Sequence, residues 1–297
     1  MRDQAAKLRE LAALAREPRP ARAPGGVDRG RVIAVTSGKG GVGKSSVVAN
    51  LGTELARRGR RVTVIDADFG LANLDILFNL NPSHHLGHLL NGQASAAQVV
   101  SGVEGVPELQ IIPGASGMEA LADLDASERE RLLSALAPMT AGREFVLIDT
   151  AAGIGRNVID LCVAAGEVIL VTNPEPTSLT DAYGLLKILR QRDAGVRVLL
   201  LVNSASDLAE GDRVHAKLED VVRRFLDGSL EYLGAIQRDP CVSRATARQS
   251  PFVLSYPRAA ASRAVSAVAD TLLGAPAADS GGSKGFWRRL LAVGGGA

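Results

Sequence analysis

The chain has 297 residues, 46% of them hydrophobic, and a formal net charge of +2, which fits one large α/β domain better than two. Its two cysteines, Cys162 and Cys241, are too few for a disulfide framework or an all-cysteine metal site, and no apolar run approaches the roughly 20 residues that cross a bilayer. We therefore expect buried, reduced thiols in a cytosolic protein that is neither exported nor membrane-spanning. Positive charge collects at the ends and leaves residues 32–273 with 23 Lys/Arg against 27 Asp/Glu, a balance that disfavours general binding to nucleic acid.

The N-terminal segment DQAAKLRELAALAR places apolar side chains at spacings of three and four residues, which predicts a short amphipathic helix. The next stretch, PRPARAPGG, contains three prolines and two glycines and predicts a linker. We therefore expect residues 1–17 to form a detached helical element and residues 18–30 to tether it. A detached apolar stripe needs a partner surface.

From Arg31 onward, short β-branched runs alternate with helical patterns, which begin at about Lys44 and end over residues 259–273. The runs are apolar throughout, as expected of parallel strands covered on both faces. We therefore predict a doubly wound α/β domain over residues 31–273, with a mostly parallel sheet and helices on both faces. The predicted strands are RVIAVTS, RVTVID, LQIIPG, FVLID, EVILVTN, VRVLLLVN and LEYLGAI.

The segment TSGKGGVGKSS, residues 36–46, joins the first predicted strand to the first predicted helix. It contains G-x-x-x-x-G-K-S in the strand–loop–helix context in which this motif binds phosphate. Glycines let backbone amides approach the phosphates, Lys44 supplies charge to the β and γ phosphates, and the Ser45 hydroxyl is placed to ligate Mg²⁺. The predicted nucleotide contacts in this loop are Gly38, Gly40, Gly41, Val42, Gly43, Lys44, Ser45 and Ser46.

Acidic residues follow two further predicted strands. Asp66 and Asp68 come after RVTVI, and Asp149 ends FVLID. Ligands of open parallel sheets bind at the carboxyl ends of the strands, where both clusters fall. Asp66 is nearer its strand, so we expect it to support the following loop. Each of these residues, taken alone, is also a suitable helix cap, so the assignments depend on one another.

The second lysine of the loop, Lys39 in KGGVGKS, makes the motif resemble the deviant Walker A family that includes MinD, ParA and the nitrogenase iron protein. The resemblance implies an ATPase that uses Mg²⁺ and forms a nucleotide-sandwich homodimer. In such a dimer Lys39 reaches the phosphates of the other subunit and adds positive charge where the transition state gathers negative charge. The resemblance also implies that Asp68 orients the attacking water and that Asp149 holds Mg²⁺ through water. With Lys39 and Asp68, Lys44 completes the implied catalytic set.

Three further positions match that family. Gly153 gives the loop after the fourth strand room to sense the γ phosphate. Asn203 ends VRVLLLVN, where the family reads the adenine edge with an amide that both donates and accepts. Asp181 resembles a family position near the extra lysine.

The last apolar segment, KGFWRRLLAV, follows GAPAADSGGS, so we expect a linker over residues 274–283 and an amphipathic helix over residues 284–297. At a helical period the aromatic and leucine side chains share one arc, and the basic side chains lie outside it. This pattern is typical of a helix lying in an anionic membrane interface, and it resembles the C-terminal membrane-targeting helix of MinD-type ATPases. The predicted membrane contacts are Phe286, Trp287, Arg288, Arg289, Leu290 and Leu291. The alternative is that the helix packs on its own domain.

The N-terminal DQAAKLR resembles the D-Q-A-x-x-L-R element of flagellar number regulators, the FlhG or FleN branch of the MinD family. The resemblance implies that this element docks on FlhF, a GTPase of the signal-recognition type, and stimulates its hydrolysis. The matching residues are Asp3, Gln4, Ala5, Leu8 and Arg9. An ordinary capped helix at a terminus is the alternative.

The sequence therefore predicts a regulatory ATPase that dimerises with ATP, attaches reversibly to the inner face of the cell membrane and controls flagellar number or placement. Partners among basal-body or transcriptional-regulator proteins are compatible with this reading, and no direct nucleic-acid partner is expected. The alternatives are a septum-placing MinD, a partitioning ParA, and a metabolic ligase or iron–sulfur reductase on the same scaffold. His84, His85 and His88 lack the glutamate or cysteines of a metal motif, so we expect them at the surface or an interface.

Overall fold

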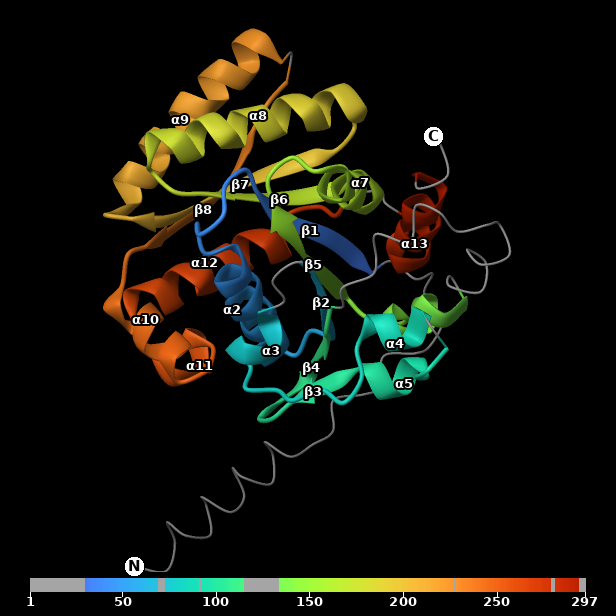
Figure 1. Ribbon diagram of the computed structural model, residues 1–297. Coiled ribbons are helices and arrows are strands. Elements are labelled where there is room, and N and C mark those ends of the chain that lie inside the picture. The colour runs from blue at the N-terminus through green and yellow to red at the C-terminus, as the bar shows by residue number, and fades with distance from the viewer. Residues whose placement is uncertain are drawn as a thin grey trace, which may run out of the picture.

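The computed structural model describes residues 30–68, 73–90, 92–114, 134–226, 228–278 and 281–293. Its centre is one eight-stranded sheet with the order β3-β4-β2-β5-β1-β6-β7-β8, and helices cover both faces (Figure 1). This confirms the predicted doubly wound α/β fold. The N-terminal positions matched to the flagellar regulators, residues 3–9, lie outside the described residues.

All seven predicted strands are present and pair in parallel, for the reason that their apolar runs suggested: both faces of the central strands are buried, and only the edge strand β8 is partly exposed along its length. The structure adds β3, a strand of three residues that pairs antiparallel with β4 at the sheet edge. It is too short to give a pattern that sequence can reveal. The strands are β1 Arg31–Ser37, β2 Val62–Ala67, β3 Ser101–Val103, β4 Val106–Ile112, β5 Phe145–Ala152, β6 Glu167–Thr172, β7 Arg197–Ala205 and β8 Glu231–Gln237.

Two hydrophobic cores lie on opposite faces of the sheet. One packs the sheet against α7, α8, α9 and α13, and the other packs it against α2, α11 and α12 (Figure 1). Among the described residues, no helix combines the length and apolar character needed to cross a membrane. The helices are α2 Lys44–Arg57, α3 Leu74–Leu77, α4 Leu86–Leu90, α5 Ala96–Val99, α7 Arg156–Ala165, α8 Pro176–Arg192, α9 Leu208–Phe225, α10 Pro240–Ala247, α11 Phe252–Ser255, α12 Ala260–Gly274 and α13 Gly282–Val293.

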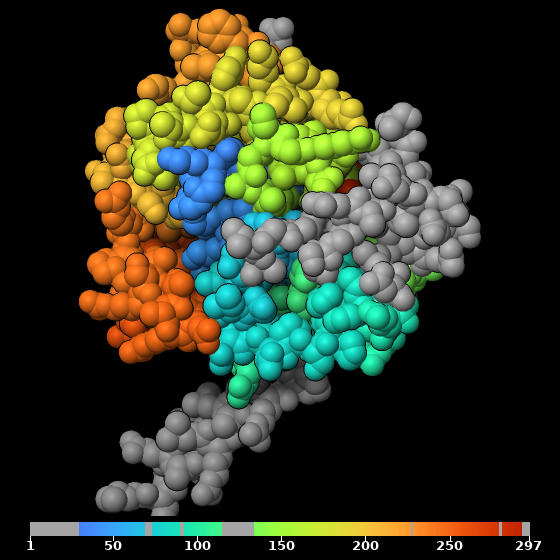
Figure 2. Space-filling view, in the orientation of Figure 1, coloured from blue at the N-terminus to red at the C-terminus, as the bar shows by residue number. Residues whose placement is uncertain are grey.

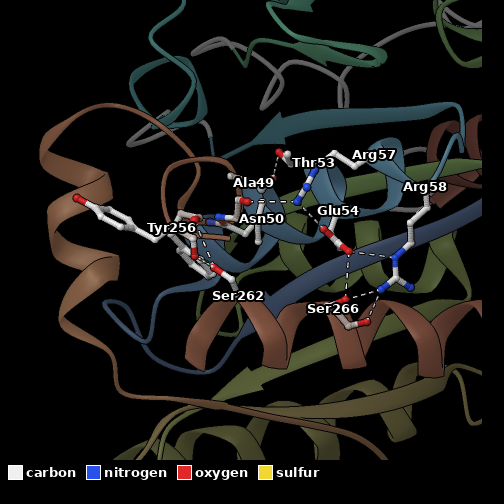
Figure 3. Close-up of polar contacts among 11 residues, drawn as sticks. Ala49, Asn50, Thr53, Glu54, Arg57, Arg58, Tyr256, Ser262 and Ser266 are labelled. Carbon is white, nitrogen blue, oxygen red and sulfur yellow. Dashed lines mark hydrogen bonds and ion pairs between the residues drawn. The ribbon is translucent and has the colours of Figure 1, made fainter. Parts of the chain in front are cut away.

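Helix α2, which follows the glycine-rich loop, is held in place by side chains that reach the C-terminal helices (Figure 3). Asn50 accepts a hydrogen bond from the backbone nitrogen of Val253 at 3.0 Å and donates one to the carbonyl of Ser46 at 2.7 Å. One helical turn further along α2, Glu54 accepts a hydrogen bond from the hydroxyl of Ser266 on α12 at 3.2 Å. Because buried polar groups are costly unless paired, these bonds fix the helix that carries the loop.

A buried charge network lies at the amino-terminal ends of the parallel strands β1, β6 and β7. Glu167 is 1% exposed and accepts from Arg31 at 2.7 and 2.5 Å and from Arg197 at 3.2 Å. Arg31 also donates to the carbonyl of Leu272, near the end of α12, at 2.5 Å. The network therefore joins β1, β6 and β7 to the helix that precedes the C-terminal tail.

The C-terminal helix α13 packs on its own domain, which is one of the two arrangements that the sequence left open. It begins at Gly282, so the stretch between α12 and α13 is shorter than the predicted linker 274–283. The helix lies against α7 and β1. The indole nitrogen of Trp287 donates to the hydroxyl of Thr140 at 3.0 Å. The apolar arc faces the domain and joins the hydrophobic core beside α7. The buried side chains of this arc are Phe286, Trp287, Leu290 and Leu291.

Candidate active site

The glycine-rich loop connects the end of β1 to the start of α2, at the carboxyl edge of the parallel strands. Figure 2 shows this segment in blue at the surface, between the yellow-green and cyan parts of the chain. Gly43 has φ +86°, a conformation that L side chains rarely adopt, and a Cβ there would collide with the side chain of Asn203. Gly38 packs against the backbone of Asp181 in α8, where a Cβ would also collide. Both glycines are therefore required by the shape of the loop.

Lys44 is the first residue of α2, and its Nζ lies 2.5 Å from Oδ1 of Asp149 on β5. The two side chains are 7% and 1% exposed. Burial raises the pKa of the Asp149 carboxyl, and the ammonium of Lys44 opposes that rise. The structure thus brings the phosphate-binding lysine and the predicted Mg²⁺-holding carboxylate, 105 residues apart in sequence, into direct contact.

Asp66 lies beside Asp149 in the parallel register of β2 and β5. Burial, followed by the charge of Asp149, raises the pKa of Asp66 to about 7. Its carboxylate accepts backbone N–H bonds from Asp68 at 3.1 Å, Asn73 at 3.2 Å and Leu74 at 3.3 Å. Asp66 therefore ties together both ends of the loop that carries Asp68, which agrees with the supporting role expected for it.

A cavity of about 180 Å³ adjoins the loop on the side of β7 and β8. Its lining includes Val42, Asn203, Asp239 and Phe252. Asn203 donates through Nδ2 to the carbonyl of Val42 at 2.7 Å, so the amide oxygen remains as the acceptor. An acceptor at this position suits the exocyclic amine of adenine.

Lys39 extends away from the buried pair of Lys44 and Asp149. Its Nζ lies 2.9 Å from Oε2 of Glu175 and 2.9 Å from the hydroxyl of Thr177, and its side chain is 38% exposed. The hydrogen bond and charge of Lys39 lower the pKa of Glu175. The loop therefore presents one lysine inward and one at the surface.

Sequence reasoning missed Glu175, Thr177 and those residues of the cavity beside Asn203 that come from α10 and α11. It matched Asp181 to a family position near the extra lysine. In the structure the backbone of Asp181 lies against Gly38, beside Lys39, and the side chain of Lys39 contacts Glu175 and Thr177 at the start of α8. The signal available was the position of Glu175, directly before a proline that begins a helix after a buried strand. Contacts between segments more than a hundred residues apart are not visible in a local pattern.

The cysteines and histidines take no part in this site. Cys162 is fully buried in α7, and burial raises its pKa to about 12, but Cys241 is only half-buried, contrary to expectation. His85 and His88 stack with ring centroids 3.8 Å apart. Within the described ranges no group of three His, Cys, Asp or Glu side chains is placed to hold a metal ion.

The residues fit a triphosphate with Mg²⁺. A loop that only glycine can build lies at the N-terminus of α2, Lys44 and Ser45 follow it, and a buried carboxylate reaches the same point. The fold and this site define a P-loop nucleoside triphosphatase.

Comparison with known proteins narrows the class. A family model described as the CobQ/CobB/MinD/ParA nucleotide binding domain matches residues 33–252. The chain belongs to this MinD/ParA family of P-loop ATPases, with ATP and Mg²⁺ as ligands of the site.

Two relatives and one solved structure are informative. The chain is 41% identical over 239 residues to the antiactivator FleN of Pseudomonas aeruginosa, covering 80% of this chain and 85% of that one. It is 34% identical over 275 residues to the flagellum site-determining protein YlxH of Helicobacter pylori, covering 88% and 90%. The septum site-determining protein MinD of Pyrococcus horikoshii, solved with Mg-ADP, superposes with a TM-score of 0.66 at 27% identity, covering 82% and 97%. The likeness to FleN and YlxH agrees with the branch indicated by the sequence.

Proposed function

We propose that this protein is a nucleotide-operated switch that controls flagellar number or placement. In this proposal ATP assembles two copies into a dimer, the dimer attaches to the inner face of the cell membrane, and hydrolysis reverses both steps. The similarity to an antiactivator and to a flagellum site-determining protein supports the flagellar role. An antiactivator relative also favours a transcriptional regulator among the partners.

The contacts within one copy support the hydrolytic roles that we propose. Lys44 carries the charge that neutralises the β and γ phosphates, and it exchanges its contact with Asp149 for the phosphate oxygens. Ser45 and Asp149 would hold Mg²⁺. Bound Mg²⁺ offsets the negative charge of the phosphates. Asp68 orients the attacking water, at a position set by its backbone bond to Asp66.

The outward position of Lys39 is the observation that supports dimerisation. The site of one copy already has a buried lysine, and Lys39 is held by Glu175 and Thr177 at the surface instead of near Lys44. An exposed ion pair contributes little to stability, so Lys39 can leave Glu175 at small cost. A lysine with this mobility and position is suited to reach the phosphates of a second copy.

Sedimentation with saturating ATP and Mg²⁺ tests this step. We expect the Asp68→Ala variant to form a stable dimer, because ATP stays intact. Adding Lys39→Ala should abolish that dimer while leaving ATP binding to the monomer within about threefold of the parent, a difference of roughly 0.7 kcal/mol. A monomeric Asp68→Ala protein, or an undiminished dimer without Lys39, would remove the proposal.

The N-terminal element would contact the partner GTPase. Residues 1–17 would contact an FlhF-type GTPase through Asp3, Gln4, Ala5, Leu8 and Arg9, with residues 18–30 as tether. Deleting residues 1–17 should abolish stimulation of that GTPase and leave the intrinsic ATPase unchanged. Unchanged stimulation would remove the flagellar assignment that rests on residues 1–17.

The C-terminal helix would provide membrane attachment after leaving its groove. It packs on α7, and α7 begins directly after the loop that follows Asp149 and β5. A change in that loop on nucleotide binding therefore acts on the same helix that holds α13. Pairing two short helices in a dimer would strengthen an attachment that one helix alone makes weakly.

A further inference from the structure

Residues 238–263, which span α10, α11 and the start of α12, have a one-sided charge. They contain five arginines and a single carboxylate, Asp239. That carboxylate accepts backbone bonds from Cys241 at 2.8 Å and from Ala261 at 3.2 Å. Asp239 thus caps two helices with bonds to the backbone, and its charge is used inside the fold.

Four of these arginines are exposed, and we call them together the arginine face: Arg244, Arg248, Arg258 and Arg263. The first two lie one helical turn apart on α10. The guanidinium of Arg248 lies 5.8 Å from the ring centroid of Tyr256, and Arg263 donates to the carbonyl of Arg258 at 2.5 Å. The four positions therefore lie on α10 and its C-cap, on the turn before α12 and on the first turn of α12, in the orange segment of Figures 1 and 2.

The arginine face differs from the rest of the surface in its ion pairing. Most other arginines of the described part of the chain have a carboxylate partner, including those of α2, α7 and α9. None of the four arginines of the face has an ion pair with a described residue. Like charges one turn apart on a helix repel, so this arrangement opposes folding unless an anion is bound there.

Three kinds of anionic partner are available, and the surroundings separate them. The tail helix α13, which would meet a bilayer, lies across the sheet from α10 and α12 (Figure 1). Outside residues 238–263, the body over residues 32–273 carries 18 Lys/Arg against 26 Asp/Glu, which would repel a duplex that runs past the face. A short acidic stretch of a protein avoids this repulsion, because it need not extend beyond the arginine face onto the acidic body.

The spacing fits such a stretch. Side chains one turn apart on α10 are about 6 Å apart, and alternate side chains of an extended chain are separated by about 6.7 Å. A guanidinium also binds a carboxylate with two parallel hydrogen bonds. We infer that the arginine face binds an extended acidic segment of a partner protein, with carboxylates at alternate positions.

Fluorescence anisotropy of the full-length protein with a labelled peptide of alternating glutamate and serine, about eight residues long, tests the inference. The variants are Arg244→Glu/Arg248→Glu and, as an independent pair, Arg258→Glu/Arg263→Glu. The matched control is Arg223→Glu/Arg224→Glu on α9, which makes the same change in net charge at arginines already paired with Asp220. Thermal unfolding and basal ATPase report whether each variant is folded.

We expect both face variants to weaken peptide binding at least tenfold, roughly the loss of one charge-assisted contact, and the control to stay within about twofold of the parent. If one face variant does not fold, the other pair decides. Absence of peptide binding to the parent overturns the inference, as does an equal loss in the control. Tighter, face-dependent binding of a duplex of about 20 base pairs, or of phosphatidylglycerol vesicles, would also overturn it in favour of that partner.

Discussion

Replacing Arg289 by alanine should strengthen attachment to an anionic membrane, although it removes a positive charge from the proposed membrane helix. In the docked helix Arg289 donates to the carbonyl of Ala164 from Nε at 2.9 Å and from Nη2 at 2.6 Å. That carbonyl lies in the last turn of α7, where a cation is favoured. The side chain therefore holds α13 in its groove.

The magnitude follows from two opposing terms. Loss of a hydrogen bond from a charged donor costs about 2 kcal/mol, which shifts the docking equilibrium about 30-fold toward release. Loss of one basic residue near an anionic surface costs about 1 kcal/mol, or about fivefold in affinity. Because apparent affinity scales with the released fraction, the variant should bind vesicles about sixfold more tightly than the parent.

The matched control is Arg288→Ala. Arg288 is exposed, so the same charge is lost without disturbing the groove. This variant should bind vesicles about fivefold more weakly than the parent. The two measurements are co-sedimentation with phosphatidylglycerol vesicles and acrylamide quenching of Trp287, the only tryptophan in the chain and 1% exposed when docked. Equal loss of binding in both variants, or unchanged quenching in Arg289→Ala, would refute competition between groove and membrane.

Other parts of the molecule give further expectations. Gly43→Ala should lose nucleotide binding in calorimetry, because its Cβ meets the amide of Asn203 at a φ of +86°. Glu167→Ala should lower the free energy of unfolding by about 3–5 kcal/mol in urea titrations, since it leaves buried guanidinium charge, whereas Arg213→Ala at an exposed pair should change it by less than about 0.5 kcal/mol. Slightly above pH 7, binding of Mg²⁺ and nucleotide should take up protons, seen as a binding heat that depends on the buffer. The reason is that Asp66, with a pKa of about 7, is largely ionised there, and the net negative charge of the complex of Mg²⁺ with the triphosphate favours its protonated form.

The fold and the phosphate loop could be predicted because their determinants are local. Continuous apolar runs identify buried parallel strands, and the glycines before Lys44 specify a loop at a helix N-terminus. Parallel strands place their carboxyl ends at one edge, so Asp149 had to lie near the loop. The pairing of Lys39 with Glu175 joins positions 136 residues apart, and no local pattern carries that information.

The tail shows a different limit of sequence reasoning. Its helical arc was recognised correctly, and its four large apolar side chains are indeed on one side. A period of 3.6 residues records that one face avoids water, but it does not say whether protein or lipid covers that face. Only the groove beside α7, including the hydroxyl of Thr140 that accepts from Trp287, distinguishes the two.

Net charge has the same limitation as periodicity. The excess of carboxylates over residues 32–273 predicts that the body as a whole repels a polyanion, but a sum cannot reveal which charges are already paired. Arginines at the base of β1 and on α2, α7 and α9 use carboxylates of the fold, whereas those of α10 to α12 do not. An acidic body with an unpaired basic face can reject long polyanions and still select a short acidic segment. The distribution of pairing, rather than the total charge, therefore decides which anion this surface accepts.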